Sequence, residues 1–314
     1  MFPASAQLHI PDGFLSLLIS LLAWLLAVIA IAAAARRAQA DLDERLVPLA
    51  GVMAAFIFAG QMINFPVAGG TSGHLIGAAL AAIVLGPWLG MLVMTAVIAL
   101  QALLFQDGGL VVMGANILVM GVAPALVGYG LYRAVAGRGR RVQLAVTAVA
   151  AWLSVMAAAL LTALFLGFSG TISFPVVVPA MLGIHALIGV GEALITVAAL
   201  SFILAARPQL MQRSATAGGR GWIAAGALVS LLVVLLSPLA SGFPDGLEWV
   251  AAETGFLQTA RDAPFELLPD YTMPFLGETA LSTIVAGLLG ALIVAAVAYL
   301  AARALRRGAP QRRV

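Results

Sequence analysis

The chain has 314 residues, of which 63% are hydrophobic and only 9% are charged, with a formal net charge of +3. A soluble fold has too little interior to bury so much apolar surface, so the composition excludes a soluble globular protein. All 16 basic residues are arginine, and cysteine is absent. Because a phosphate-binding loop needs lysine and a thiolate metal site needs cysteine, we expect neither an ATP-hydrolysing enzyme nor a thiolate metal centre.

Nine apolar runs predict an all-α, polytopic integral membrane helical bundle with about seven plus two transmembrane helices. A helix rises about 1.5 Å per residue, so roughly 20 apolar residues cross a hydrocarbon core of about 30 Å. The third run is short and Gly-rich, which predicts a broken or tilted span. The first run does not resemble a cleaved signal peptide, because Arg36 and Arg37 follow it rather than precede it. The expected spans are 14–35, 46–65, 74–85, 88–105, 110–132, 142–168, 180–206, 222–239 and 279–302.

Fifteen of the arginines fall into loops on one side of this arrangement, and only Arg261 lies on the other side. By the positive-inside rule, this asymmetry predicts a cell (inner) membrane protein with its N-terminus outside and its C-terminus cytoplasmic. Orientation in lipid explains the pI near 9.9 without nucleic-acid binding. The polar, Gly-rich stretch 207–221 predicts a cytoplasmic linker between a seven-span part, 1–206, and a two-span part, 222–314.

Two of the three histidines fall on the predicted outer side. His9 stands just ahead of the first span, where a single histidine is often only solvated, and His74 stands at the mouth of the third span after a Gly-rich loop. Two imidazoles and several backbone nitrogens on one face make a candidate metal site. The alternative for His74 is packing at the mouth of a helix.

Polar side chains inside the spans form a second group. His185 and Glu192 are seven residues apart on the seventh span, so about two turns place them on one helix face. An intramembrane carboxylate needs a partner, for which Gln61, Gln101 or His185 are candidates. The pair indicates either a proton or cation relay or, as we favour, an interhelical clamp. Interhelical hydrogen bonding also accounts for Gln61, Asn64 and Asn116.

Several strings of the chain are distinctive: HIPDGFL at 9–15, NFPVAGGTSGHL at 64–75, QALLF and DGG at 101–109, GAN at 114–116, HALIG and GE at 185–192, and FPDGLEW at 243–249. All but the last resemble the CbiM/NikM family, the substrate-capturing membrane subunits of nickel and cobalt energy-coupling-factor transporters. The last string, FPDGLEW, is similar to the PDGLE segment of the small auxiliary subunit of these transporters, the NikN type, here fused behind the linker.

The resemblance implies capture of Ni²⁺ or Co²⁺ as substrate on the outer side, with a coupling transmembrane subunit and cytoplasmic ATPase subunits as partners. It implies metal ligation by a terminal amine, by the backbone nitrogen and imidazole of His9, and by the imidazole of His74. An all-nitrogen, square-planar set suits Ni²⁺, although the sequence does not choose nickel over cobalt. Supporting roles are expected for Asn64, Ser72, Gln101, His185 and Glu192.

The first eight residues depart from the family pattern, because they separate the Met1 amine from His9. We expect the functional chain to begin at Leu8, read as Met, so that its backbone amine becomes a ligand; trimming of the stub or loss of one ligand are the alternatives.

Two other functions stay open. One is a proton-coupled secondary metal transporter that uses Glu192 and His185, and the other is a membrane cytochrome with His74 and His185 as haem ligands.

Overall fold

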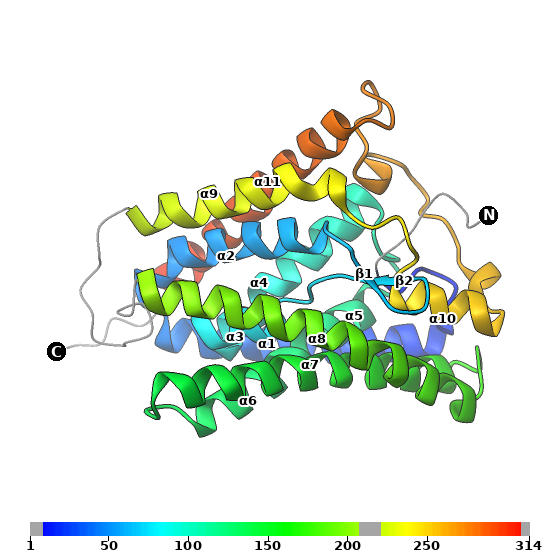
Figure 1. Cartoon of the computed structure of the whole chain (residues 1–314), viewed down its shortest axis with the longest axis horizontal. Helices are drawn as coiled ribbons and strands as arrows, with labels where there is room; N and C mark the ends of the chain where they lie inside the picture. The colour runs from blue at the N-terminus through cyan, green and yellow to red at the C-terminus, as the bar shows by residue number, and fades with distance from the viewer. Residues whose placement is uncertain (1–8, 207–220, 309–314) are drawn as a thin grey trace.

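The computed structural model describes residues 9–206 and 221–308, and its long helices lie side by side along one axis (Figure 1). Two short strands form an antiparallel hairpin in which Phe65 pairs with Gly73. The helices are α1 (Leu17–Asp41), α2 (Leu46–Gln61), α3 (Ala78–Leu85), α4 (Pro87–Leu100), α5 (Met113–Asn116), α6 (Ala123–Ala134), α7 (Arg140–Phe168), α8 (Phe174–Ala206), α9 (Gly221–Leu236), α10 (Gly246–Thr254) and α11 (Ala280–Arg307), and the strands are β1 (Phe65–Val67) and β2 (Thr71–Gly73).

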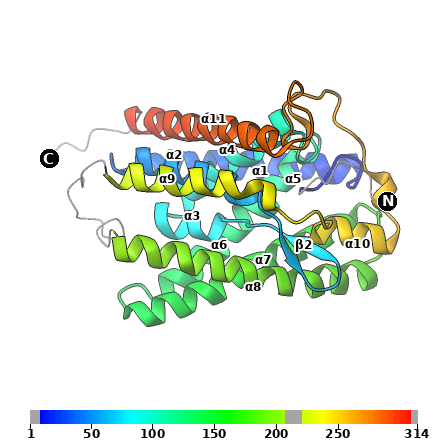
Figure 2. The same cartoon turned by 45° about the horizontal axis from the view of Figure 1, so that its top comes forward.

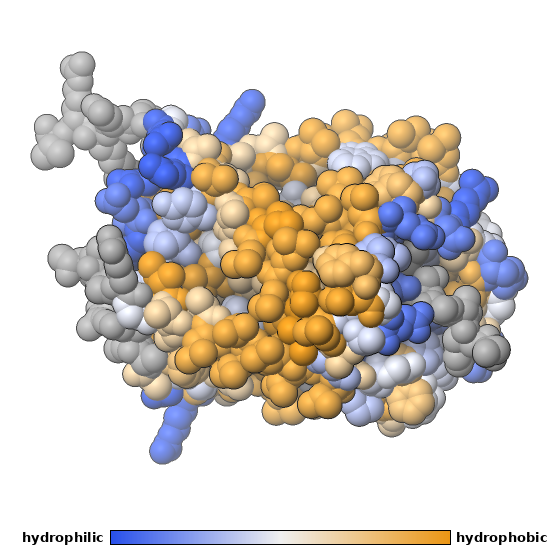
Figure 3. Space-filling model, turned by 90° about the horizontal axis from the view of Figure 1, so that it is seen from above, coloured by the Kyte–Doolittle hydropathy of each residue, from blue (hydrophilic) through white to orange (hydrophobic). Residues whose placement is uncertain are grey.

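Seven helical runs in the described part of the chain are long and apolar enough to cross a membrane. Large apolar side chains cover their outer faces, as on α1, where Leu18 and Leu25 are more than half exposed. Figure 3 shows a broad hydrophobic surface between two hydrophilic ends. In water such a surface would be unfavourable, whereas lipid tails solvate it. The expected all-α membrane bundle is therefore confirmed.

The two remaining expected spans are shorter as helices than the apolar runs that predicted them. α2 ends at Gln61 rather than at residue 65, and α3 begins at Ala78 rather than at His74. The chain between them folds into the β1–β2 hairpin and an extended stretch that ends at Gly77, whose φ of +79° is left-handed. Glycine permits that conformation, and the third apolar run is therefore only partly helical, as its short length predicted.

Other helix bounds differ from expectation for local reasons. α8 begins at Phe174 rather than at residue 180, because Pro179 lies so near the start of the helix that few hydrogen bonds are lost. Two segments are π-helical: η1 (Gln101–Phe105) continues α4, and η2 (Ile117–Val122) precedes α6. Pro124 has no N–H, which interrupts the α-helical ladder where η2 joins α6.

The C-terminal spans pack directly on the rest of the bundle. α9 and α11 both lie against α2, and a Cβ added at Gly51 of α2 would lie 2.9 Å from the carbonyl oxygen of Ala295 in α11. The segment between α9 and α11, which contains α10 and two 3-10 turns, η5 (Leu257–Thr259) and η6 (Pro269–Tyr271), turns back over the end where the hairpin lies (Figure 2). A third 3-10 turn, η4 (Ser237–Leu239), ends α9.

Glu192 on α8 holds the start of α3. Its carboxylate is fully buried and accepts hydrogen bonds from the backbone N–H groups of Ile76, at 2.6 Å, and Gly77, at 2.9 Å. Gln61 Nε2 donates to the carbonyl oxygen of Ile76 at 2.9 Å. The partners of Glu192 are thus backbone groups and not the side chains of Gln61, Gln101 or His185, because its helix faces the non-helical stretch before α3. This arrangement supports the clamp.

Glu192→Gln should lower the free energy of unfolding by about 1–3 kcal/mol, because one buried backbone N–H would then face an NH₂ group instead of an acceptor. Thr196→Val is the matched control one turn further along α8. Thr196 is equally buried, and its hydroxyl has no hydrogen-bond partner among the described residues. Thermal unfolding in detergent measures both variants, and an unchanged midpoint for Glu192→Gln would contradict the clamp.

Candidate metal-binding site

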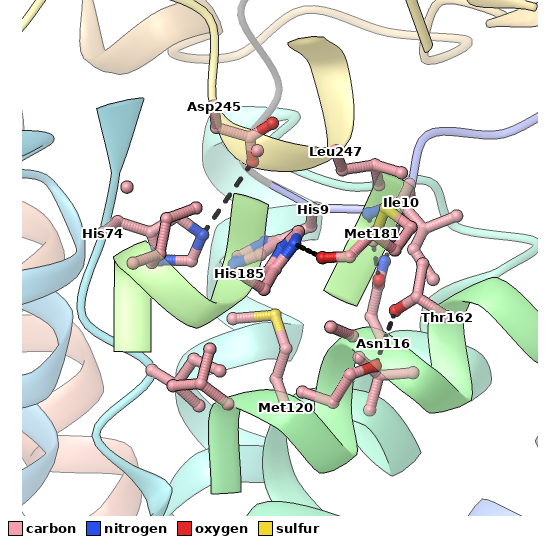
Figure 4. Close-up of a pocket in the computed structure, with 18 residues that line it drawn as sticks. His9, Ile10, His74, Asn116, Met120, Thr162, Met181, His185, Asp245 and Leu247 are labelled. Atoms are coloured by element: carbon pink, nitrogen blue, oxygen red, sulfur yellow. Dashed lines mark hydrogen bonds and ion pairs between the residues drawn. The ribbon is translucent and has the colours of Figure 1, made fainter. Parts of the chain in front are cut away.

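A cavity of about 60 Å³ lies beneath α10, at the end of the bundle where the hairpin is found. Figure 4 shows His9, His74 and His185 around this cavity with Asp245 above them. Because one water needs about 10–15 Å³ by this measure, the cavity can hold a few waters or a partly dehydrated ion. Its lining comes from six separate parts of the chain.

The backbone after His9 is held in place by the GAN string. Asn116 accepts a hydrogen bond from Ile10 N–H and donates to the carbonyl oxygen of Ile10, each at 3.0 Å, and Gly109 N–H donates to the same carbonyl at 2.9 Å. Asp12 accepts from the N–H groups of residues 110–112 just before α5. These paired contacts fix the entry of the chain into the cavity, so Asn116 serves the position of His9 and not only helix packing.

The His9 imidazole is oriented by Asp107. Its Nδ1 lies 2.9 Å from the carbonyl oxygen of Asp107 and 3.4 Å from the carboxylate oxygen Oδ1. A carbonyl can only accept, so Nδ1 carries the proton and Nε2 carries the lone pair. Nε2 is buried and has no hydrogen-bond partner among the described residues. A buried acceptor of this kind is ready to take a ligand.

His74 presents the same nitrogen to the cavity. Its Nδ1 donates to the carbonyl oxygen of Leu75 at 3.0 Å, which leaves the Nε2 lone pair facing Asp245. The centroids of the His9 and His74 rings are 5.9 Å apart, and the rings are inclined at 79°. Metal–nitrogen bonds of about 2.0–2.1 Å to each ring are compatible with that separation.

Asp245 arrives from the C-terminal part of the chain. Its Oδ2 lies 4.0 Å from His74 Nε2, while Oδ1 caps α10 by accepting from Glu248 N–H at 2.7 Å. Burial raises the pKa of the Asp245 carboxyl well above its ordinary value. A cation beside it would favour the charged form. In the sequence Asp245 stands out only as part of the FPDGLEW string, because nothing local shows that this loop lies against the histidines.

The β1–β2 hairpin holds the chain that leads to Asp245. Ser72 N–H donates to the carbonyl oxygen of Pro244 at 2.8 Å, and Ser72 Oγ donates to that of Phe243 at 2.8 Å. Thr71 Oγ1 donates to Pro244 at 3.0 Å. The loop from the first part of the chain therefore holds the PDGLE string of the second part directly over the histidines.

The described donors do not form a complete set. No group of three or more His, Asp or Glu side chains close enough to hold one ion occurs within residues 9–206 and 221–308. The small chelate ring that His9 would form with its own amide nitrogen uses Nδ1, which here faces Asp107. In the observed orientation, Nε2 of His9 has no hydrogen-bond partner among the described residues, and Nε2 of His74 lies 4.0 Å from Asp245 Oδ2.

The other residues that the sequence predicted at the site lie in different parts of the structure. Leu8 lies outside the described residues. His185 lines the cavity with its Nδ1 at 2.8 Å from the carbonyl oxygen of Met181, and Ser72 supports the loop above. Gln101 donates to Tyr271 Oη at 3.2 Å, whereas Asn64 Oδ1 has no partner among the described residues and does not line the cavity. Glu192 supports the backbone after His74 rather than the cavity.

The chain matches two known protein families one after the other. The family described as the cobalt uptake substrate-specific transmembrane region, CbiM, matches residues 9–210, and the PDGLE domain matches residues 220–307. A protein of Archaeoglobus fulgidus described under the name NikMN is 38% identical over 304 residues, which cover 95% of this chain and 99% of that protein.

Two further matches cover the same regions. The fused nickel transport protein NikMN of Rhodobacter capsulatus is 32% identical over 96% of this chain and 100% of its own length. The crystal structure of a truncated transition metal transporter superposes with a TM-score of 0.58 at 33% identity, and covers 63% of this chain and 99% of that one. The chain therefore belongs to the CbiM/NikMN family of nickel and cobalt transport components.

Proposed function

We propose that this protein is the substrate-capturing component of an ATP-driven energy-coupling-factor transporter and binds Ni²⁺ or Co²⁺ on the outer side of the cell membrane. The observation that carries the proposal is the pair of imidazoles, buried His9 and partly buried His74, which line one cavity with ring centroids 5.9 Å apart and the Asp245 carboxyl beside them. Imidazole nitrogen suits both ions. The amine of Leu8, as the residue that begins the functional chain, is the proposed further donor.

The proposed orientation rests on the arginines. Arg306 at the end of α11 forms an ion pair with Glu44 in the α1–α2 connection at 2.6 Å, and Arg37 lies over Trp88 at the start of α4. These groups mark the end of the bundle that carries the C-terminus of α11. By the positive-inside rule this end is cytoplasmic, so the cavity opens outside.

In this proposal ATP is hydrolysed by partner subunits, because the chain has no lysine for a phosphate-binding loop of its own. A coupling membrane subunit and cytoplasmic ATPase subunits are the proposed partners. The proposed domain division is a metal-binding part, 1–206, and a PDGLE part, 222–314. The proposed linker, 207–221, lies almost wholly outside the described residues.

Uptake of labelled Ni²⁺ by cells should require the ATPase partners. Cells that express this chain with those partners should accumulate the ion, and cells with an inactive ATPase should not. Accumulation that persists without ATPase activity but stops when the proton gradient is dissipated would favour the proton-coupled alternative.

His74→Ala should abolish high-affinity binding of Ni²⁺ and Co²⁺ by the purified protein, because it removes one of the two imidazoles that face each other across the cavity. Asn64→Ala is the matched control, since Asn64 lies in the same connection but not at the cavity. Metal content after dialysis and calorimetric titration measure both variants. Near-stoichiometric metal in a folded His74→Ala protein would show that the assignment is wrong.

A chain that begins at residue 8, with Met in place of Leu8, should bind the metal at least tenfold more tightly than the 314-residue form. An amine in the residue before histidine can join the ligand set, whereas an internal amide is a far poorer donor. Because lysine is absent, acetylation with an amine-reactive ester modifies only the terminal amine. It should weaken binding by the short form and leave the long form unchanged. Equal affinities in the two untreated forms would contradict the prediction, as would native protein that begins at Met1 and transports normally.

A further inference from the structure

The PDGLE string places a carboxylate opposite His74. Asp245 stands just before α10, and its Oδ2 lies 4.0 Å from His74 Nε2. Both residues line the same cavity, and Figure 4 shows the Asp245 carboxyl group above the imidazole. Bonds from a divalent metal ion to imidazole nitrogen and to carboxylate oxygen are each about 2.0–2.2 Å long. A divalent cation therefore fits between these two atoms.

The residues of the string hold this carboxylate in place. The carbonyl oxygen of Pro244 accepts hydrogen bonds from the β1–β2 hairpin, and Asp245 Oδ1 caps α10 by accepting from Glu248 N–H at 2.7 Å. Gly246 lets α10 approach α8 closely, because a Cβ there would lie only 2.9 Å from Cε1 of His185. The carboxylate thus reaches the cavity on a fixed helix end that has no side chain in the way.

This end of the bundle has an excess of buried acidic groups. Asp107, Asp245 and Glu248 are each more than nine-tenths buried, and the other two both interact electrostatically with Asp245. Asp107 accepts a hydrogen bond at 2.8 Å from Tyr271, whose ring stacks on Phe105. Within residues 9–206 and 221–308, no arginine pairs with Asp245 or Glu248, and Glu248 Oε2 has no hydrogen-bond partner. Buried carboxylates are usually paired or bind a metal ion, so these groups call for a cation.

The distance between the two donors determines where the carboxylate would stand around the ion. With bonds of about 2.1 Å, the separation of 4.0 Å gives an angle of roughly 145° at the ion, so Asp245 lies nearly opposite His74. In the proposed set of four nitrogens, the position opposite His74 belongs to the His9 amide nitrogen, because the terminal amine and the His9 imidazole flank that nitrogen in the chelate. Asp245 and the His9 amide nitrogen thus compete for one position.

We propose that Asp245 and His74 form a capture site, which holds an incoming Ni²⁺ or Co²⁺ by one carboxylate oxygen and one imidazole nitrogen before the chelate closes. The His9 amide then loses its proton to water, its nitrogen binds the ion and the carboxylate oxygen leaves. One anionic donor replaces another, so the charge around the ion is preserved. The inference rests on the proposed function, because it uses the His74 ligand and the chelate of that function.

A carboxylate suits this first step better than the final donors do. It can replace a water ligand of the cation directly, whereas the amide nitrogen binds only after its proton leaves. Acidic groups that line a cavity also raise the local concentration of cations and the rate of their association. A donor that acts only before the chelate closes should change the rate of loading and leave the final affinity almost unaltered.

The test compares Asp245→Asn with Glu248→Gln, both in the chain that begins at residue 8 with Met and in the 314-residue form. Asparagine caps a helix as well as aspartate does, and Asp245→Ser, which also caps, serves if the first variant does not fold. Glu248→Gln removes the same charge from the same helix, but Glu248 does not line the cavity. Stopped-flow quenching of tryptophan fluorescence gives the association and dissociation rates of Ni²⁺, and thermal unfolding checks the fold.

In the chain that begins at residue 8, Asp245→Asn should slow association of Ni²⁺ roughly tenfold or more. Dissociation should slow in parallel, since the ion leaves by the path on which it enters, so Kd should change by less than about threefold. The 314-residue form lacks the amine that completes the chelate, so there the capture pair holds the ion and Asp245→Asn should weaken binding roughly tenfold. Glu248→Gln should change each quantity by less than about threefold.

Three outcomes would overturn the capture site: an unchanged association rate in Asp245→Asn, an equal loss of rate in Glu248→Gln, or faster dissociation from the chain that begins at residue 8, which would make Asp245 a ligand of the finished site. Failure of the proposed function is separately visible. If His74→Ala still binds the ion tightly, the metal site itself is wrong; if His74→Ala loses the ion while Asp245→Asn loads as fast as the unaltered protein, only the capture site is wrong.

Discussion

The non-helical stretch between α2 and α3 imposes the main constraint on this structure. Lipid cannot satisfy exposed backbone groups, so a chain that leaves the helical conformation at membrane depth needs partners from within the protein. The carboxylate of Glu192 accepts hydrogen bonds from the N–H groups of Ile76 and Gly77, and the side-chain amide of Gln61 donates to the carbonyl oxygen of Ile76. His74 stands two residues before this clamp. The hydrogen bonds that satisfy the backbone of Ile76 and Gly77 therefore also fix the stretch of chain that carries His74.

The site depends on segments far apart in the sequence. Asn116 and Asp107 position the chain at His9, and the hairpin positions Asp245 opposite His74. All three cavity histidines donate a hydrogen bond from Nδ1–H to a backbone carbonyl, so Nε2 carries the lone pair in each ring. Because the carbonyls belong to fixed backbone, the choice of tautomer follows from the fold. The cavity consequently offers lone pairs and a carboxyl group, which suits a cation and disfavours an anion.

The sequence was sufficient to predict the helices, because apolar run length is a property of short stretches, and it placed His9 and His74 at the same end of the bundle, where both line one cavity. It could not predict the supporting contacts. Asp107 lies 98 residues from His9, and Tyr271 lies 164 residues from Asp107. Which loops meet depends on how helices pack, and no periodicity in the PDGLE part shows that Tyr271 turns inward. The hairpin and the late start of α3 were missed because a glycine-rich apolar run resembles a short helix.

Fusion of the two parts has a physical consequence for the site. The contacts that bring Asp245 to the cavity and Tyr271 to Asp107 are a few loop hydrogen bonds and one stacked ring, a small interface for two separate proteins. Covalent linkage makes their association intramolecular, and effective concentrations in the millimolar range follow for short linkers. The packing of α9 and α11 on α2 adds a buried contact within the bundle. Covalent linkage and this packing therefore keep the outer loop of the PDGLE part beside the histidines although each single contact there is small.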